Sequence, residues 1–456
     1  MDDQQQSDGP KPAADVVQTR ARELQLAFEL LRQSVDFTQA NELCPLSKQA
    51  VFTTAVTLWM LVYQRMNQDQ TLEAAVQLLI ASQPDLLPQN KRVQGGLSTK
   101  TGTYSTARSR LPLRMVEWLA NQVADSIIKP AATTFADRPV YLIDGTTVTL
   151  APEPVLRTAF PPATNQHGAG VWPVALLVMT HELGSGAALI PEIAPKFGDQ
   201  AVSETALVER AIARLPTSAI VMADAGFGIF HVARTVHDSG RPFVFRLTQQ
   251  RYLALRKPAR LVQGHSRGDC HELTWRPSVD ERRKHGFAAD VAIEVRLIEV
   301  KVHDDLTVYL ATTLPDAAAA IGELYHRRGE VEIDLRNFKV VLNAEHLAAR
   351  SVDTFHKELL GSVIAYNLVT QFRKQAAIKA NVEPRRLSFK RVWTTFRTFL
   401  LTECHTDPQR WEARYAEALH YASTAKLPHR PNRSYARETY TRREKSVQFA
   451  KRSPPQ

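Results

Sequence analysis

Residues 139–150, PVYLIDGTTVTL, mark the point at which the sequence changes from a helical to an extended pattern. The stretch is apolar and rich in β-branched residues, which favour strands, and the turn-forming residues APEP follow it. Asp144 stands inside the stretch, directly after the apolar run VYLI. We therefore predict a strand that places a carboxylate at the edge of a sheet, where the charge can face solvent or a metal.

The segments that follow predict the element order β-β-β-α-β-α-β up to residue 250. GVWPVALLVMTHE and GAALIPEIA are joined by the turn LGSG and predict a hairpin, whereas the later strands alternate with helices as in parallel crossover units. A second carboxylate, Asp224, follows the buried strand AIVMA and precedes AGFG. Residues 251–314 are strand-like, with strict alternation from Val291 to Leu297, and predict an all-β insertion.

The part of the chain before this sheet is helical in pattern. Residues 1–18 are polar and predict a disordered N-terminus, and residues 19–135 carry apolar side chains at intervals of three and four. Arg108, Arg110 and Arg114 lie close together at a predicted helix pair, and such a pair can lie along DNA. Residues 19–135 are therefore a candidate DNA-binding domain, and an ordinary helical domain with a charged face is the alternative.

Composition limits the classes of protein to which this chain can belong. Its 456 residues favour two or three domains, and its net charge of +10 favours a polyanionic partner. Residues 426–456 form a basic tail, which predicts either contact with phosphates or a solvated tail. No apolar run approaches the roughly 20 residues of a membrane helix, and the three scattered cysteines fit a reducing cytoplasm.

The stretch YHRRGEVEIDLRNFKVVLN, residues 325–343, places Tyr325, Arg328, Glu332 and Lys339 at steps of three, four and seven. These are helical intervals, so we predict one helix that carries all four side chains along a single stripe. Glu330 would point about 160° away from Glu332 on this helix. A solvated amphipathic helix with a salt-bridged face is the alternative interpretation.

Asp144, Asp224 and Glu332 are the candidate ligands of a metal centre. Three converging carboxylates repel one another unless cations neutralise them, and oxygen ligands of this kind suit Mg²⁺ or Mn²⁺. Two such ions can activate an attacking oxygen and stabilise a leaving oxygen in phosphoryl transfer.

These residues together resemble the DDE transposases of the insertion-sequence-four type, whose signature is Y-x(2)-R-x(3)-E-x(6)-K. DGTT resembles the first aspartate motif of that family, ADAGF the second, and KELLGSVIAYNLV the segment after the signature helix; TGTYSTARSRLP resembles part of its N-terminal region. The resemblance covers roughly residues 45–400. It implies an α/β, RNase H-like catalytic domain with antiparallel leading strands, parallel later strands and a β insertion.

The resemblance also implies a domain organisation. The catalytic core would comprise residues 136–250 and 315–350, with the insertion at 251–314 between them and a C-terminal helical region at 351–425. Asp144 and Asp224 would lie on neighbouring strands, with Glu332 on a helix beside them.

Roles for individual residues follow from the same resemblance. Asp144, Asp224 and Glu332 would be the catalytic metal ligands for two Mg²⁺ or Mn²⁺ ions. The expected DNA contacts are Arg328 and Lys339 with phosphates, Tyr325 with a phosphate or a displaced nucleotide, and further contacts from Arg336 and Arg246. Trp275 would stack on a flipped base of the terminal duplex, and a core position is its alternative.

The implied function is that of a DNA transposase that cuts and rejoins the ends of an insertion sequence. Its partners would be double-stranded DNA, as terminal inverted repeats and as target, and a second copy of the chain on DNA. No membrane partner is expected, and the location would be the bacterial cytoplasm in association with the nucleoid. A metal-dependent nuclease without strand transfer and a non-catalytic DNA-binding repressor are the alternatives, although an intact carboxylate triad speaks against the repressor.

Overall fold

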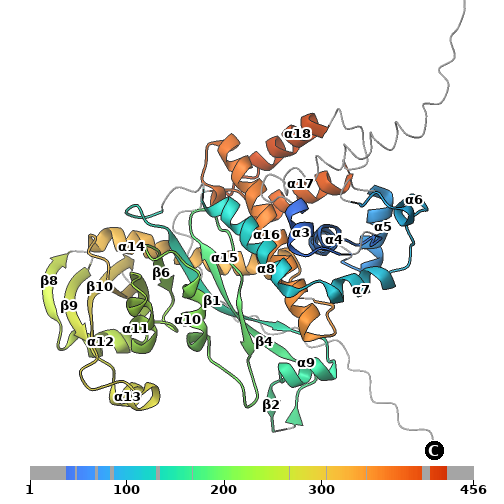
Figure 1. The fold of residues 1–456 in the computed structure, drawn as a ribbon. Coiled ribbons are helices and arrows are strands. Elements are labelled where there is room, and N and C mark those ends of the chain that lie inside the picture. Colours follow the sequence, from blue (N-terminus) through green and yellow to red (C-terminus); the bar gives the residue numbers. More distant parts are fainter. Residues whose placement is uncertain are drawn as a thin grey trace, which may run out of the picture.

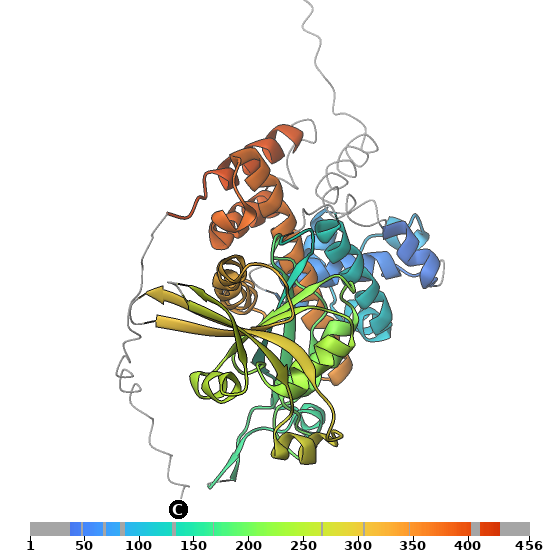
Figure 2. The same ribbon diagram turned by 90° about the vertical axis from the view of Figure 1, so that its left-hand side faces the viewer.

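A computed structural model describes residues 37–428, apart from 47–48, 67–69, 83–86, 130–133, 167, 266–267, 304–305, 346 and 403–410. The predictions for residues 1–18 and for the basic tail beyond residue 428 lie outside the described residues. The described chain is a mixed α/β structure with helices on both sides of one large sheet (Figures 1 and 2).

Nine strands of the described chain form this sheet, in the order β5-β4-β1-β6-β7-β11-β10-β9-β8. They are β1 (Val140–Thr149), β4 (Val174–Glu182), β5 (Glu192–Pro195), β6 (Ile220–Ala223), β7 (Phe243–Leu247), β8 (Arg260–His265), β9 (Gly268–Trp275), β10 (Ile293–His303) and β11 (Leu306–Thr312). Two short strands, β2 (Thr164–Asn165) and β3 (Gly168–Ala169), pair separately between β1 and β4.

The pairing of the leading strands confirms the predicted change from antiparallel to parallel. β1 is antiparallel to β4, with Asp144 opposite Met179, and β4 is antiparallel to β5. β1 and β6 are parallel, as are β6 and β7. Asp224 directly follows β6, so the two aspartates belong to neighbouring strands as predicted.

Residues 251–314, predicted to be all-β, contain helices as well as strands. They include most of α12 (Gln249–Arg256) and all of α13 (Val279–His285). The strands of this segment continue the main sheet, because β11 pairs antiparallel with β7, and β10, β9 and β8 follow outward. A capping box between Ser278 and Glu281 starts α13, and Gly286 ends it in the left-handed conformation with φ 68°.

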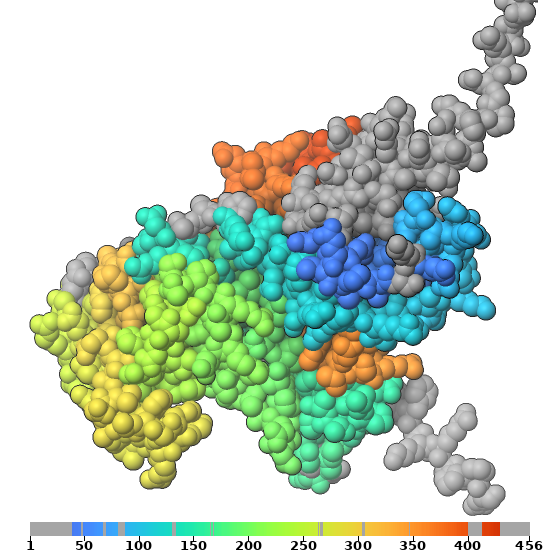
Figure 3. Space-filling model, in the orientation of Figure 1, coloured from blue at the N-terminus to red at the C-terminus, as the bar shows by residue number. Residues whose placement is uncertain are grey.

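The remaining helices lie before, between and after the strands. They are α3 (Phe37–Leu43), α4 (Thr54–Met66), α5 (Leu72–Ser82), α6 (Lys91–Gln94), α7 (Gly102–Arg110), α8 (Leu113–Ile128), α9 (Pro154–Ala159), α10 (Val208–Ala213), α11 (Phe230–Asp238), α14 (Ala318–His326), α15 (Glu330–Arg336), α16 (Val352–Ala380), α17 (Phe389–Thr402) and α18 (Trp411–Ser423). In Figure 3, α13 and the region of α9 form two projections with a hollow between them.

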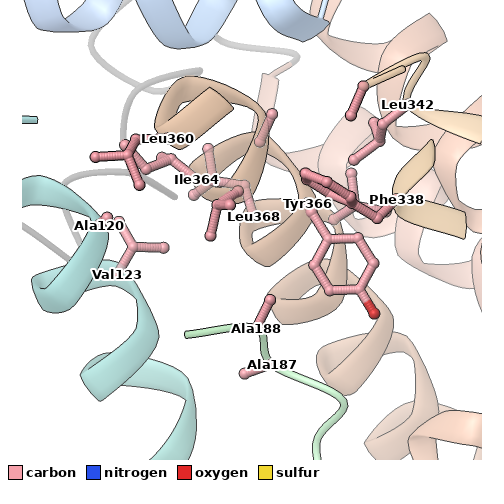
Figure 4. Packing of buried hydrophobic residues seen from close by; sticks show 14 of the residues in the cluster. Ala120, Val123, Ala187, Ala188, Phe338, Leu342, Leu360, Ile364, Tyr366 and Leu368 are labelled. Atoms are coloured by element: carbon pink, nitrogen blue, oxygen red, sulfur yellow. The ribbon is translucent and has the colours of Figure 1, made fainter. Parts of the chain in front are cut away.

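The long helix α16 is the centre of the helical part. It packs against α8 and α4 from the N-terminal region and against α17 and α18 from the C-terminal region. Leu360, Ile364 and Leu368 of α16 approach Ala120 and Val123 of α8 (Figure 4). Every residue of α4 is buried, so the N-terminal helices share one core with the C-terminal helices.

Alternation along β1 decides which face of the sheet carries Asp144. Tyr141 and Ile143 belong to the apolar cluster under α10 and α11. Leu142 belongs to the other cluster, which includes residues of α14, α15 and α16. Since side chains alternate along a strand, Asp144 lies on the same face as Leu142, towards α15.

Candidate active site

Three carboxylates from distant segments of the chain converge on one guanidinium group. Arg328 Nη2 donates to Asp144 Oδ2 at 3.0 Å and lies 3.6 Å from Asp224 Oδ2. Arg328 Nη1 donates to Glu332 Oε1 at 2.7 Å. The predicted triad is therefore assembled around a cation that belongs to the same four-residue signature.

Backbone amides fix the two aspartates. The amide of Gly145 donates to Asp144 Oδ1 at 2.9 Å, and the amide of Gly226 donates to Asp224 Oδ1 at 2.8 Å. Arg251 of α12 holds the turn after Asp224 by donating to the Gly228 carbonyl at 2.7 Å. These bonds orient each carboxylate. Asp224 directly follows β6 as predicted, whereas Asp144 lies in the middle of β1, because pairing with β4 continues to Thr149.

The signature residues lie on one continuous helical run that contains three kinds of turn. A 3₁₀ turn, Arg327–Gly329, joins α14 to α15, and a π-helical turn, Asn337–Val341, follows α15. Tyr325 and Arg328 precede α15, Glu332 is in its first turn, and Lys339 lies within the π turn. Lys339 reaches Glu345, with Nζ 3.9 Å from Oε2, and does not join the carboxylates in the described structure.

Burial disfavours the charged form of the ionisable side chains at this site. It raises the pKa of Asp144 to about 6, and the neighbouring charges of Asp224 and Glu204 act in the same direction, while Arg328 opposes them. Tyr325 is buried, and this burial raises the pKa of its phenol well above the ordinary range. The Tyr325 hydroxyl is therefore neutral at physiological pH and can donate a hydrogen bond.

The other two carboxylates of α15 face away from this site. Arg385 Nε lies 2.7 Å from Glu330 Oε2, and Arg385 Nη2 donates to Asp334 Oδ2 at 2.7 Å. Arg327 Nε also donates to Glu330, at 3.2 Å. The prediction that Glu330 points away from Glu332 is confirmed.

The donor chemistry of the triad fits a hard divalent cation. All three side chains are carboxylates, and two of them lie within 3.6 Å of one nitrogen atom. As they stand, no three His, Cys, Asp or Glu side chains of the described residues are grouped closely enough to hold a metal. Arg328 occupies the space between the carboxylates, so Asp144, Asp224 and Glu332 could hold a metal only after its guanidinium withdraws. Its Nε is buried and has no hydrogen-bond partner among the described residues.

Three residues predicted to contact DNA are buried. One is Tyr325, and the other two, Trp275 and Arg108, are built into the protein core. Trp275 is 3% exposed and packs edge-on against Phe230, with ring centroids 5.8 Å apart. Because its ring is covered, it cannot stack on a flipped base in this conformation, and the prediction is wrong here. The prediction for Arg108 is also wrong, because this buried side chain donates to Glu358 at 2.6 Å and to Gln64 at 3.1 Å.

Four other candidates for DNA contact, Arg110, Arg114, Arg246 and Arg336, are exposed, whereas Arg328 and Lys339 are half-buried. Arg110 lines a groove of about 1030 Å³ between α4, α5, α6 and α7, together with the cations Lys91, Arg92 and Lys100. Arg246 lines a second cavity of about 460 Å³, which begins at Ala225, the residue after Asp224.

Sequence reasoning missed three residues around the triad. Glu204 lies against β1, where a side chain at Gly145 would overlap its carboxylate. Asp334 and Arg385 form the buried pair behind α15. Asp334 was present in the signature stretch as an unexplained acid at an apolar helix position, whereas nothing in the local sequence distinguishes Glu204 or Arg385.

Two comparisons of sequence relate this chain to known proteins. The family model described as Transposase DDE domain matches residues 135–368. A relative, Transposase InsG for insertion sequence element IS4 of Escherichia coli (strain K12), is 25% identical over 302 residues, which are 65% of this chain and 66% of that protein. The match thus spans a little under two thirds of the relative.

A solved structure of a piggyBac transposase synaptic complex with hairpin DNA covers 91% of this chain and 87% of its own, at 11% identity and a TM-score of 0.37. Among the described residues, no helix is long and apolar enough to cross a membrane. The family match covers more than half of the chain and includes all three carboxylates of the site. The chain therefore belongs to the DDE transposases, in the group of the insertion-sequence-four type.

Proposed function

We propose that this chain is an enzyme that cuts and rejoins the ends of an insertion sequence by metal-dependent phosphoryl transfer. The observation that carries the proposal is the convergence of Asp144, Asp224 and Glu332 on Arg328. Asp144 and Asp224 are 80 positions apart in the chain, and Asp224 and Glu332 are 108 positions apart, yet all three carboxylates contact the same guanidinium group. A purely structural ion pair would not require three acidic side chains from distant segments. Asp144 is also partly desolvated, as is common for functional carboxylates.

Asp144, Asp224 and Glu332 would hold Mg²⁺ or Mn²⁺, two ions in our proposal, which when bound activate the attacking oxygen and stabilise the leaving one. The first reaction adds a water oxygen to the phosphorus at the end of the element and breaks the bond to the 3′ oxygen, which leaves as a hydroxyl. This hydroxyl then attacks a second phosphodiester, forming one P–O bond and breaking another. The first step consumes one water molecule and leaves a phosphomonoester, and the second exchanges one phosphodiester bond for another, so water is the sole co-reactant.

Arg328 has a second role in this proposal. In this structure its guanidinium contacts all three carboxylates and offsets part of their negative charge. A DNA phosphate offers the same guanidinium another anionic, bidentate partner. Transfer of Arg328 to the phosphate would open the space between the carboxylates and hold the scissile strand, with Tyr325 donating its hydrogen bond beside it.

The order of the sheet supports an RNase H-like core at 136–250 and 315–350. The five strands β5-β4-β1-β6-β7 change from antiparallel to parallel pairing at β1, which carries the first aspartate. α15 lies over the same face as Asp144 and supplies Glu332.

We further propose that the helical region 19–135 binds the DNA of the terminal repeat. The groove between α4, α5, α6 and α7 supports this, because none of the described residues that line it is acidic and four are Lys or Arg. Cations of this kind bind the phosphate backbone. Lys339 and Arg336 would extend the contact beyond the active site to the end or to target DNA. We place the protein in the bacterial cytoplasm, with the nucleoid, as a homodimer on DNA.

Incubation with a supercoiled plasmid that carries the element's two ends tests the proposed function. We expect Mg²⁺-dependent excision and strand-transfer products from the native chain. Asp144→Asn, Asp224→Asn and Glu332→Gln should each abolish both products while end binding persists, and Glu323→Gln, on an exposed residue of α14, should leave both intact. Cleavage without strand transfer would favour a nuclease, and end binding without cleavage by the native chain would favour a repressor.

A further inference from the structure

We propose that Arg385 is a positioning residue that ties the helix carrying Glu332 to the part of the sheet that carries Asp144. This inference rests on the proposed function, since it concerns how the triad is held. It assigns a role to a residue that lies 53 positions after Glu332 and outside the signature stretch.

The helix α15 carries three carboxylates within five residues, and Arg385 separates their roles. Glu330 and Asp334 are one turn apart on one face of the helix, and Arg385 contacts both at 2.7 Å. Glu332 is on the opposite face, towards Arg328. One arginine therefore removes two of the three acids from competition for a metal and fixes the rotation of the helix about its axis.

The burial of this pair makes the arrangement rigid. The side chain of Arg385 is 9% exposed and that of Asp334 is 0% exposed. The second oxygen of Asp334 accepts a hydrogen bond from the Tyr366 hydroxyl of α16, at 3.1 Å. Both Asp334 oxygens are thus engaged, and a buried carboxylate with this many partners cannot turn without leaving a charge unpaired.

Arg385 is also bound to the sheet. It lies in a short 3₁₀ turn, Pro384–Arg386, and its Nε donates to the carbonyl of Leu183 at 2.8 Å. Leu183 directly follows β4, the strand that pairs with β1 around Asp144. The carboxylate of Glu182 closes the turn after β4 by accepting from the amides of Gly184 and Ser185 at 2.7 and 2.6 Å. Arg385 therefore bridges a rigid turn of the Asp144 sheet and the rear face of the Glu332 helix.

Arg327 provides a matched comparison. Its Nε lies 3.2 Å from Glu330, and its Nη2 lies 3.8 Å from the exposed carboxylate of Glu383. Neither of these two contacts reaches the turn after β4, to which Arg385 is bound. A variant at Arg327 loses an ion pair to the same carboxylate without losing the connection to β4.

The test compares Arg385→Gln, Arg385→Lys and Arg327→Gln in the full chain bound to a DNA end. Mn²⁺ affinity is measured from the electron paramagnetic resonance signal of free Mn²⁺, and the Mg²⁺ concentration for half-maximal cleavage is measured in parallel. Partners that orient metal ligands typically contribute about 10- to 100-fold to metal affinity. We expect a weakening of this size for Arg385→Gln, partial recovery for Arg385→Lys and near-native values for Arg327→Gln, with metal-free DNA affinity unchanged.

If Arg385→Gln alone does not fold, the double variant Arg385→Gln, Asp334→Asn is used instead. The double variant leaves no unpaired charge in the core, because the side chain at position 334 is then neutral. It should keep the metal defect, since the link from α15 to the turn after β4 is still missing. Native metal affinity in either folded variant overturns the inference, as does a loss of cleavage with an unchanged metal requirement. If the native chain itself neither binds Mn²⁺ nor cleaves DNA, the proposed function fails instead.

Discussion

Replacing Arg328 with alanine should increase the affinity of the DNA-free protein for divalent cations. The guanidinium holds the space between the carboxylates, and a metal must displace it. Its hydrogen bond to Asp144, whose side chain is 16% exposed, is worth about 1.5–3 kcal/mol as a charge-assisted contact. The bond to Glu332, whose side chain is 54% exposed, adds only about 0.3–0.5 kcal/mol.

Together these contacts predict that Arg328→Ala binds Mn²⁺ roughly 20- to 300-fold more tightly, since each 1.4 kcal/mol is about tenfold. Titration of free Mn²⁺ by electron paramagnetic resonance at pH 8, without DNA, measures this affinity. Arg327→Ala is the control, because its guanidinium contacts Glu330 and Glu383 outside the triad. Unchanged or weaker Mn²⁺ binding by Arg328→Ala would refute the idea that this arginine competes with metal. The same variant should lose cleavage, because the phosphate contact is lost too.

Three further predictions concern pH and packing. Because the pKa of Asp144 is raised to about 6, protons should compete with metal below that pH, and Mn²⁺ affinity should fall about tenfold per pH unit there but stay level above pH 7. Burial lowers the pKa of His181 to about 4, so between pH 6.5 and 4 the unfolded chain takes up a proton at this residue while the folded chain does not. The free energy of unfolding of the native protein, measured by urea titration, should therefore fall by about 3 kcal/mol over this pH window, and that of His181→Phe should fall by less. Trp275→Ala should lower the unfolding free energy by about 3–5 kcal/mol and should slow cleavage of intact and abasic DNA ends equally, whereas selective rescue by the abasic site would return Trp275 to a base-stacking role.

Much of the sheet could be predicted from the sequence because its signals are local. The apolar runs before Asp144 and Asp224 each mark a strand, and at Asp224 the carboxylate also marks the end of the strand. The helical spacing from Tyr325 to Glu332 likewise identified residues that the structure brings to one site. The ends of α13 were also encoded locally, by Ser278, Glu281 and Gly286, although the strand-like residues around them dominated the prediction for the insertion.

The rest depends on contacts between distant segments. The role of Arg328 as a counter-ion depends on three carboxylates from distant segments meeting around it, which spacing along one helix cannot predict. Burial of Trp275 and Arg108 follows from which neighbours cover them, namely Phe230 in one case and Glu358 of α16 in the other. A strand tryptophan or a helix arginine has the same local pattern whether it faces the core or a ligand.

The N-terminal helices illustrate the same limit at a larger scale. Their periodicity predicts amphipathic helices, and such helices can bury one another or another part of the chain. In the structure α4 and α8 pack along α16, more than 200 residues away in sequence. The sequence therefore predicted the apolar stripe of each helix, but it did not predict that α16 packs against that stripe.

If Asp144, Asp224 and Glu332 bind the catalytic metal once Arg328 has moved to DNA, anomalous scattering from Mn²⁺ in crystals of the protein bound to a DNA end should show it. We expect anomalous density between the three carboxylates, with the Arg328 guanidinium on a phosphate oxygen. Manganese bound away from these carboxylates, or Arg328 still bridging them beside a bound DNA end, would contradict it.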